Sequence, residues 1–170
     1  MIPNKFFRLC FVLCIFIFSN AYGETNSHCS PNEKIFFSCP IGKKIVSLCE
    51  SKGDGPDQYL EYRYGKPNKI ELRYKGGASV PTIRFNKAEV YQASNGGTEI
   101  WFNIKEIYYV LSAPIKGGPY LEIYKNGNSI ARLACNDGWG KVEGDPEDSS
   151  SSINNRTKDD FYAEVLNIKN

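Results

Sequence analysis

Short runs of alternating apolar and polar residues follow one another through most of this chain, and clusters of Gly, Pro and Asn separate them. That pattern predicts β-strands joined by tight turns. It is clearest in three stretches, residues 34–49, 58–75 and 120–135, each of which reads as a hairpin. We therefore expect a mainly β fold, a small antiparallel barrel or sandwich of about eight to ten short strands with a short C-terminal helix.

The turn around Pro67 sets the register that we expect for the second hairpin. A pivot at Pro67 places Arg63 opposite Glu71 and Glu61 opposite Arg73. Opposite charges facing each other across a strand pair favour that register. We expect this charged face to be solvated and to lie above a core.

The last hairpin has a stronger turn signal, Asn126-Gly127-Asn128. A pivot on Gly127 pairs Glu122 with Arg132. The same register gives Cys135 the inward parity of Leu133. This predicts that Cys135 can form a bond with the interior side of another strand.

A strand pair in the middle of the chain is apolar on both faces. On one face of residues 98–112 lie Ile100, Phe102, Ile104, Ile107, Tyr109 and Leu111. The opposite face carries Trp101, Tyr108 and Val110. Such a pair is either buried on both sides or exposes a contact surface. Trp101, Tyr108 and Val110 are therefore candidate partner-binding residues.

The chain changes character after the last predicted strand. Residues 24–140 form the expected β domain, and Trp139 stands between glycines outside any strand pattern. Residues 141–157 are acidic and then serine-rich, a composition typical of a linker. Residues 158–170 form the expected helical tail. Trp139 is a further candidate partner-binding residue.

The tail has the signals of a short amphipathic helix over residues 159–168. Thr157 and Asp160 have the spacing of a capping box. Its apolar side chains, spaced as on one helix face, are Phe161, Val165, Leu166 and Ile168. So short a helix needs a surface to dock on. We favour docking on the Trp101 face of its own domain; the alternative is that Phe161, Val165 and Leu166 bind a partner.

The first 23 residues have the pattern of a secretory signal peptide. Lys5 and Arg8 precede an apolar run over residues 9–18, and small residues follow at Ala21 and Gly23. The run is short for a membrane-spanning helix. We expect a periplasmic or secreted protein that meets a membrane only during export.

Four cysteines remain in the mature chain and predict two disulfides. Three pairings are possible, and hairpin geometry disfavours Cys39–Cys49. Of the other pairings we favour Cys29–Cys49 with Cys39–Cys135. The cysteine spacings lack close pairs and the chain has one histidine, His28, so a zinc site is not expected.

Charge argues against nucleic acid as a partner. Without Lys5 and Arg8, the mature chain has 19 basic and 19 acidic residues. Proteins that bind nucleic acid usually carry a basic excess on one face. We expect no nucleic-acid partner.

No set of residues in the sequence has the pattern of a catalytic site. The one candidate base for a nucleophile, His28, lies close to the mature N-terminus. Glu99, Glu106 and Glu122 have no predicted ion-pair partner in common, and nothing in the sequence groups them. We therefore predict no catalytic residues, no cofactor, no metal and no enzyme activity.

Several segments resemble a family of small exported bacterial proteins of unknown function. They are IFFSC, GKKIVSLC, YLEYRYGKPNKIEL, IRFNKAEVY, GGTEIWF and LEIYKNGNSIARLAC, with the spacing of the last three cysteines. The resemblance implies a periplasmic or secreted β protein. More loosely, the layout is similar to the membrane-bound and periplasmic lysozyme inhibitors, which are small disulfide-tied antiparallel barrels without catalytic residues.

These observations together predict an exported, non-catalytic binding protein that inhibits or neutralises a protein partner. Its two specific forms are inhibition of a lysozyme and immunity against a secreted toxin. The alternative is a structural or small-ligand/lipid-binding envelope protein, whose Phe and Tyr residues would line a cavity.

Overall fold

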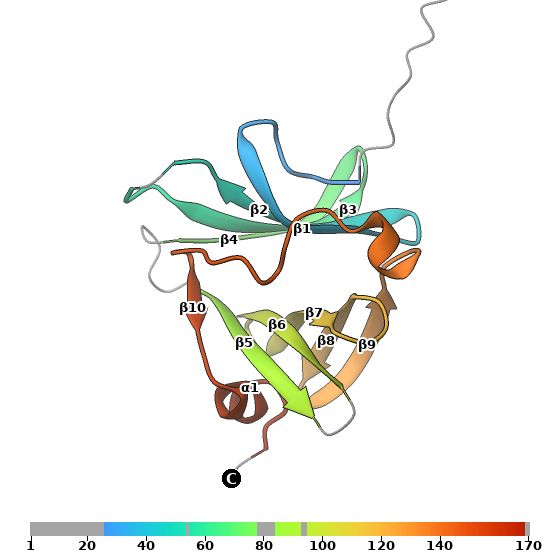
Figure 1. The fold of residues 1–170 in the computed structure, drawn as a ribbon, viewed down its shortest axis with the longest axis vertical. Helices are drawn as coiled ribbons and strands as arrows, with labels where there is room; N and C mark the ends of the chain where they lie inside the picture. The colour runs from blue at the N-terminus through green and yellow to red at the C-terminus, as the bar shows by residue number, and fades with distance from the viewer. Residues whose placement is uncertain (1–25, 54, 78–83, 93–94, 169–170) are drawn as a thin grey trace, which may run out of the picture.

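Two sheets packed face to face form the computed structural model of this chain, which describes residues 26–53, 55–77, 84–92 and 95–168 (Figure 1). The four-stranded sheet has the order β1 (Glu33–Ile41), β2 (Lys44–Ser51), β3 (Tyr59–Lys66), β4 (Lys69–Gly77). The six-stranded sheet has the order β10 (Ile153–Asn155), β5 (Phe85–Gln92), β6 (Asn95–Ile104), β7 (Ile107–Pro114), β8 (Tyr120–Lys125), β9 (Asn128–Ala134). A 3-10 turn, η1 (Gly138–Lys141), and a helix, α1 (Lys158–Glu164), complete the described elements.

The predicted fold class is confirmed, and of its two forms the sandwich is correct, because the sheets do not close into a barrel. The expected signal peptide lies outside the described residues. Among the described helices, none is long and apolar enough to cross a membrane.

Aromatic side chains fill the space between the sheets. Phe102 stacks on Tyr74 at a centroid distance of 4.3 Å and on Tyr109 at 5.1 Å. Tyr62 and Phe85 pack against the same ring at 4.9 Å and 5.2 Å. The face of residues 98–112 that carries Phe102 and Tyr109 thus forms the centre of the core, where these rings pack on one another.

Both preferred disulfides are present. Cys29 bonds Cys49 with their Cα atoms 5.3 Å apart, and Cys39 bonds Cys135 with a Cα separation of 5.7 Å. The second bond joins β1 to the end of β9, at the edges of different sheets. Asn136 extends this junction, because its backbone N–H donates to the Pro40 carbonyl at 2.8 Å.

The predicted register of the β3–β4 hairpin is wrong. Arg63 lies opposite Arg73, not Glu71, and Glu61 lies opposite Lys75. The cause is a bulge at Gly65, where a Cβ would lie 2.3 Å from the Lys69 carbonyl oxygen. The last hairpin, by contrast, has the predicted register, with Glu122 opposite Arg132.

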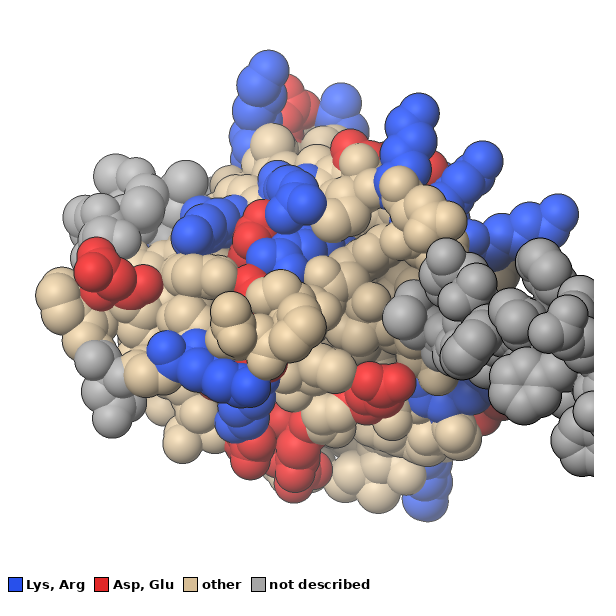
Figure 2. All heavy atoms as spheres, turned by 90° about the horizontal axis from the view of Figure 1, so that it is seen from above, with Lys and Arg blue, Asp and Glu red and all other residues tan. Residues whose placement is uncertain are grey.

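The charged face of the β3–β4 hairpin is solvated on β4, where Glu71, Arg73 and Lys75 are exposed, but it is buried on β3 at Glu61 and Arg63. Arg63 donates to both carboxyl oxygens of Glu33 at 2.6 Å and to Glu61 at 2.5 Å. Residues 26–29 cover it, and the His28 carbonyl accepts another Arg63 N–H at 2.8 Å. Burial by itself would raise the pKa of Glu33, but the Arg63 guanidinium lowers it to about 2. In the view onto the four-stranded sheet, Lys and Arg side chains project outward at the edges of the molecule (Figure 2).

Residues 141–157 are not a free linker, because they run along the edges of both sheets. Glu143 exchanges two backbone hydrogen bonds with Ser38, at 2.8 and 2.9 Å. Asp148 forms an ion pair with Lys34 at 2.8 Å. Ile153 begins β10, which pairs in parallel with β5. The segment is polar because it lies at the surface. Its strand β10 was not predicted, because a single buried residue, Ile153, does not produce an alternating pattern.

The helix docks on its own domain, as favoured from the sequence. The predicted capping box of Thr157 and Asp160 is present. The helix ends at Glu164, earlier than predicted, and Asn167 follows in a left-handed conformation with φ 55°. Its apolar side chains form a second small core, which contains Ala88, Val90, Trp101, Val110, Phe161 and Val165.

The two disulfides should differ in their contribution to stability. Replacing Cys39 and Cys135 together with alanine should lower the free energy of unfolding by about 2–5 kcal/mol. Replacing Cys29 and Cys49 should cost roughly 1 kcal/mol less, because that bond closes a sequence separation of 20 residues and the other closes 96. Urea denaturation followed by tryptophan fluorescence measures both. An equal or larger loss for the Cys29/Cys49 pair would contradict the greater contribution of Cys39–Cys135.

Arg63→Met should cost about 3–5 kcal/mol of unfolding free energy, because Glu33 would be left buried without its cation and Glu61 would keep only the exposed Arg73. The matched control is Arg73→Met. Its side chain also contacts Glu61, at 3.0 Å, but is 55% exposed, so the loss should stay under about 1 kcal/mol. Chemical denaturation at neutral pH compares the two, and equal losses would show that the Arg63 network is not a buried structural unit.

Candidate functional site

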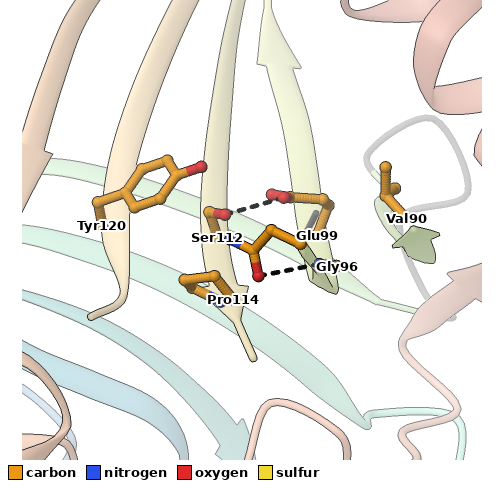
Figure 3. A pocket seen from close by; sticks show the side chains of 7 residues that line it. Val90, Gly96, Glu99, Ser112, Pro114 and Tyr120 are labelled. Carbon is orange, nitrogen blue, oxygen red and sulfur yellow. Dashed lines mark hydrogen bonds between the residues drawn. The ribbon is translucent and has the colours of Figure 1, made fainter. Parts of the chain in front are cut away.

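A shallow depression on the outer face of the six-stranded sheet contains a half-buried carboxyl group (Figure 3). Its volume is about 110 Å³, and its lining consists of Val90, Asn95, Gly96, Glu99, Ser112, Pro114 and Tyr120. The strand register produces it, because Glu99 pairs with Ser112 and Ser112 pairs with Tyr120. Directly paired residues project from the same face of a sheet. The three side chains therefore form a row across β6, β7 and β8.

Glu99 is protonated at neutral pH in this environment. Burial is the main cause, and it raises the pKa of Glu99 to about 8. The Ser112 hydroxyl donates to Glu99 at 2.8 Å and opposes the shift, whereas the nearby Glu122 charge adds to it. No Lys or Arg forms an ion pair with Glu99 among the residues that the structure describes. The depression thus presents a neutral acid that can donate a proton or a hydrogen bond.

Glu122 lies on the same face and has the opposite shift. Burial would raise its pKa, but hydrogen bonds from Arg132 at 2.9 Å, from Ser129 at 2.6 Å and from Tyr124 outweigh burial and lower it. Glu122 is therefore ionised where Glu99 is neutral. A pair of carboxyl groups with separated pKa values is the arrangement that acid–base chemistry uses.

The size of the depression limits what it can hold. Small-molecule sites usually have volumes of about 300–1,000 Å³. At about 110 Å³ this one suits a single side chain of a larger partner. Its geometry therefore favours recognition of a protruding group over enclosure of a substrate.

Three large apolar side chains are exposed on segments that adjoin the depression or the loop after β7. They are Tyr91, 58% exposed, Ile115, 66% exposed, and Trp139, 42% exposed. The Ile115 N–H donates to the Gly96 carbonyl at 2.7 Å, and a Cβ on Gly96 would lie 2.3 Å from the Tyr91 ring. A Cβ on Gly118 would lie 2.7 Å from the Gly138 Cα, so the Trp139 turn sits beside the loop after β7. We call these three side chains the apolar rim.

The structure places most of the sequence-predicted contact residues elsewhere. Trp101, Val110, Phe161 and Val165 are buried in the second core, and Tyr108 and Leu166 pack against it half-buried. They form the contact between the sheet and its own helix, so they offer no free surface here. Trp139 is the member of that set that remains exposed.

Glu99 and Glu122 were not predicted as a site. Their grouping depends on two successive registers, Glu99 with Ser112 and Val110 with Glu122. The sequence showed the Glu122–Arg132 pair but not the position of β6 relative to β8. In the described part of the chain, no three His, Cys, Asp or Glu side chains lie close enough to hold a metal ion.

Comparison with family models, with curated proteins and with solved structures finds no match to this chain. A functional proposal therefore depends on the geometry of the site.

Replacing Glu99 should change how stability depends on pH. Between its ordinary pKa of 4.5 and about 8, the folded protein keeps a proton on Glu99 that the unfolded chain has lost. The free energy of unfolding should therefore fall as pH rises through this window. Glu99→Gln should remove that fall and leave the variant more stable than the wild type at pH 8, by roughly 1–3 kcal/mol.

Urea denaturation at the two ends of the window measures this effect. The matched control is Glu122→Gln, which removes an ionised carboxylate and its ion pair with Arg132; because the pKa of Glu122 is lowered, this variant should lose stability across the whole window. Identical pH dependence in the wild type and Glu99→Gln would contradict a buried neutral acid.

Proposed function

We propose that this protein is an exported, non-catalytic binding protein that inhibits or neutralises a protein partner. The observation that carries the proposal is the apolar rim next to a depression the size of one side chain. Exposed Trp and Tyr residues beside a small pocket are typical of the centre of a protein interface. The disulfide-tied sandwich keeps this surface preorganised, which reduces the entropy cost of binding.

A basic side chain is the group that best fits the depression. The described residues 84–168, which carry the depression, contain twelve acidic and nine basic residues, and residues 26–77 contain nine basic and six acidic ones. Glu99 and Glu122 both belong to the acidic part. A Lys or Arg of the partner entering the depression would form an ion pair with Glu99 and release its proton.

Proton release gives this mode of binding a signature. Because Glu99 must ionise to pair with a cation, affinity should rise with pH up to about 8. An uncharged partner group that only accepts a hydrogen bond from protonated Glu99 would show the opposite dependence.

Two partners fit an exported protein of this kind, a lysozyme and a secreted toxin. Both disulfides are typical of an oxidising compartment. Export to the periplasm or outside the cell is part of this proposal. The lipid-binding alternative is less favoured, because Phe102 stacks on Tyr109 and meets Phe85 edge-on between the sheets.

Catalysis is the second candidate function. The separated pKa values of Glu99 and Glu122 favour it, because one group can donate a proton while the other acts as a base. In that case hydrolysis of peptidoglycan or of a simple ester should disappear in both Glu99→Gln and Glu122→Gln. The small volume of the depression argues for binding instead.

The binding proposal predicts that the mature chain, residues 24–170, captures a protein from the exported fraction of its organism and protects against a lysozyme or a secreted toxin. Trp139→Ala and Ile115→Ala should each weaken capture about tenfold or more, because central aromatic and apolar anchors carry most interface energy. The matched control is Ile168→Ala, whose side chain is 48% exposed but lies at the end of the tail.

The affinity of the wild type and of Glu99→Gln for the captured partner, measured at acidic and at alkaline pH, tests the proposed ion pair with Glu99. The variant should lose both affinity and its pH dependence. Absence of any partner, together with absence of protection in either assay, would overturn the proposal.

A further inference from the structure

A second pocket opens where β4 meets β5, β6, β10 and the C-terminal end of α1. Its volume is about 430 Å³, within the usual range for small-molecule sites. Apart from Tyr74, every side chain in its lining is charged or an amide, and the amides are Asn86, Asn103, Asn154 and Asn155. It shares no lining residue with the Glu99 depression.

The parallel pairing of β10 with β5 assembles the amide cluster. It places Asn154 beside Asn86 in register. The Asn154 side-chain N–H donates to the Asn86 oxygen at 3.4 Å, and Arg84 donates to the Asn154 oxygen at 3.3 Å. Both distances lie beyond the usual range for hydrogen bonds of this kind. A ligand can therefore replace them with shorter bonds at little cost.

The Arg156 charge is compensated inside the protein. Its guanidinium donates to Asp160 at 3.1 Å and to Glu164 at 2.5 Å. Glu164 in turn accepts a hydrogen bond from the Trp101 indole at 3.1 Å. These contacts fix Arg156 and Glu164 in one wall of the pocket and leave neither charge in need of a ligand.

The lining favours a neutral ligand with many hydroxyl groups, because four amides outnumber the charged groups Arg84, Arg156 and Glu164, and Arg84 already donates to Asn154. Each amide offers two donors and one acceptor, which matches a hydroxyl that both donates and accepts. An anion would favour uncompensated cations, a lipid would favour apolar walls, and a hard metal ion would favour clustered carboxylates. Tyr74 adds an aromatic ring to the lining, whose packing on Phe102 holds it in place.

We infer that this pocket binds a neutral oligosaccharide through the amides of Asn86, Asn103 and Asn154, with Tyr74 as an apolar wall. This activity is independent of the proposed protein-binding surface. In an exported protein, this pocket would bind a glycan while the apolar rim remains free for a protein partner.

The inference is tested by NMR titration of the mature chain with three neutral trisaccharides: triacetylchitotriose, cellotriose and maltotriose. The protein should come from a bacterial host, because Asn155-Arg156-Thr157 is a glycosylation sequon. At least one sugar should give saturable shifts of the pocket amides. The Asn86→Ala/Asn154→Ala double variant should weaken that binding about tenfold, the effect of losing one or two hydrogen bonds.

Asn32→Ala, which alters an exposed amide remote in sequence from the pocket-forming strands, should bind like the wild type. Asn103→Ala should also bind more weakly, and it leaves the β5–β10 contact untouched. Three outcomes would overturn the inference: no saturable shift with any sugar, undiminished binding in the double variant, or a preference for glucose 6-phosphate over every neutral sugar, which would indicate an anion site.

Discussion

The bond between Cys39 and Cys135 is the constraint on which the rest of the structure depends. It joins the first strand of one sheet to the last long strand of the other, across a sequence separation of 96 residues. The stacked core rings lie between the two sheets. Beyond Cys135 the chain passes through Asn136, which is bonded to the β1–β2 turn at Gly42, and reaches Trp139 four residues after the disulfide. The same clamp that holds the sheets together therefore positions the exposed tryptophan of the apolar rim.

Two glutamates, Glu33 and Glu99, have opposite pKa shifts because only one of them is paired with a cation in the described part of the chain. Burial acts on both Glu33 and Glu99, yet the pKa of Glu33 falls to about 2 and that of Glu99 rises to about 8. The difference is a cation: Arg63 contacts both oxygens of Glu33, whereas Glu99 has the Ser112 hydroxyl. The Glu33 network fixes residues 26–29 over the four-stranded sheet. The Glu99 carboxyl has no such cation among the described residues, and in the proposed complex a basic side chain of the partner would form an ion pair with it.

The sequence was informative where one local signal determined the structure. Asn126-Gly127-Asn128 determined the register of the last hairpin, and Thr157 with Asp160 determined the start of the helix. Hairpin geometry disfavoured only Cys39–Cys49, and of the two remaining pairings the favoured one is present. Prediction failed where distant segments decide the outcome. The bulge at Gly65, the burial of Arg63 under residues 26–29 and the pairing of β10 with β5 all depend on such contacts. The Glu99–Glu122 site was missed for the same reason, because it needs three strands in their final order.

We propose that the partner-binding surface is the apolar rim with its depression, and not the face of the six-stranded sheet that α1 covers. Photo-crosslinking in the organism's exported fraction tests it most directly, with a photoreactive phenylalanine analogue at Trp139 in one sample and at exposed Lys158, on α1, in another. We expect a discrete protein adduct from position 139 and none from position 158. An adduct from position 158 with none from position 139 would contradict it.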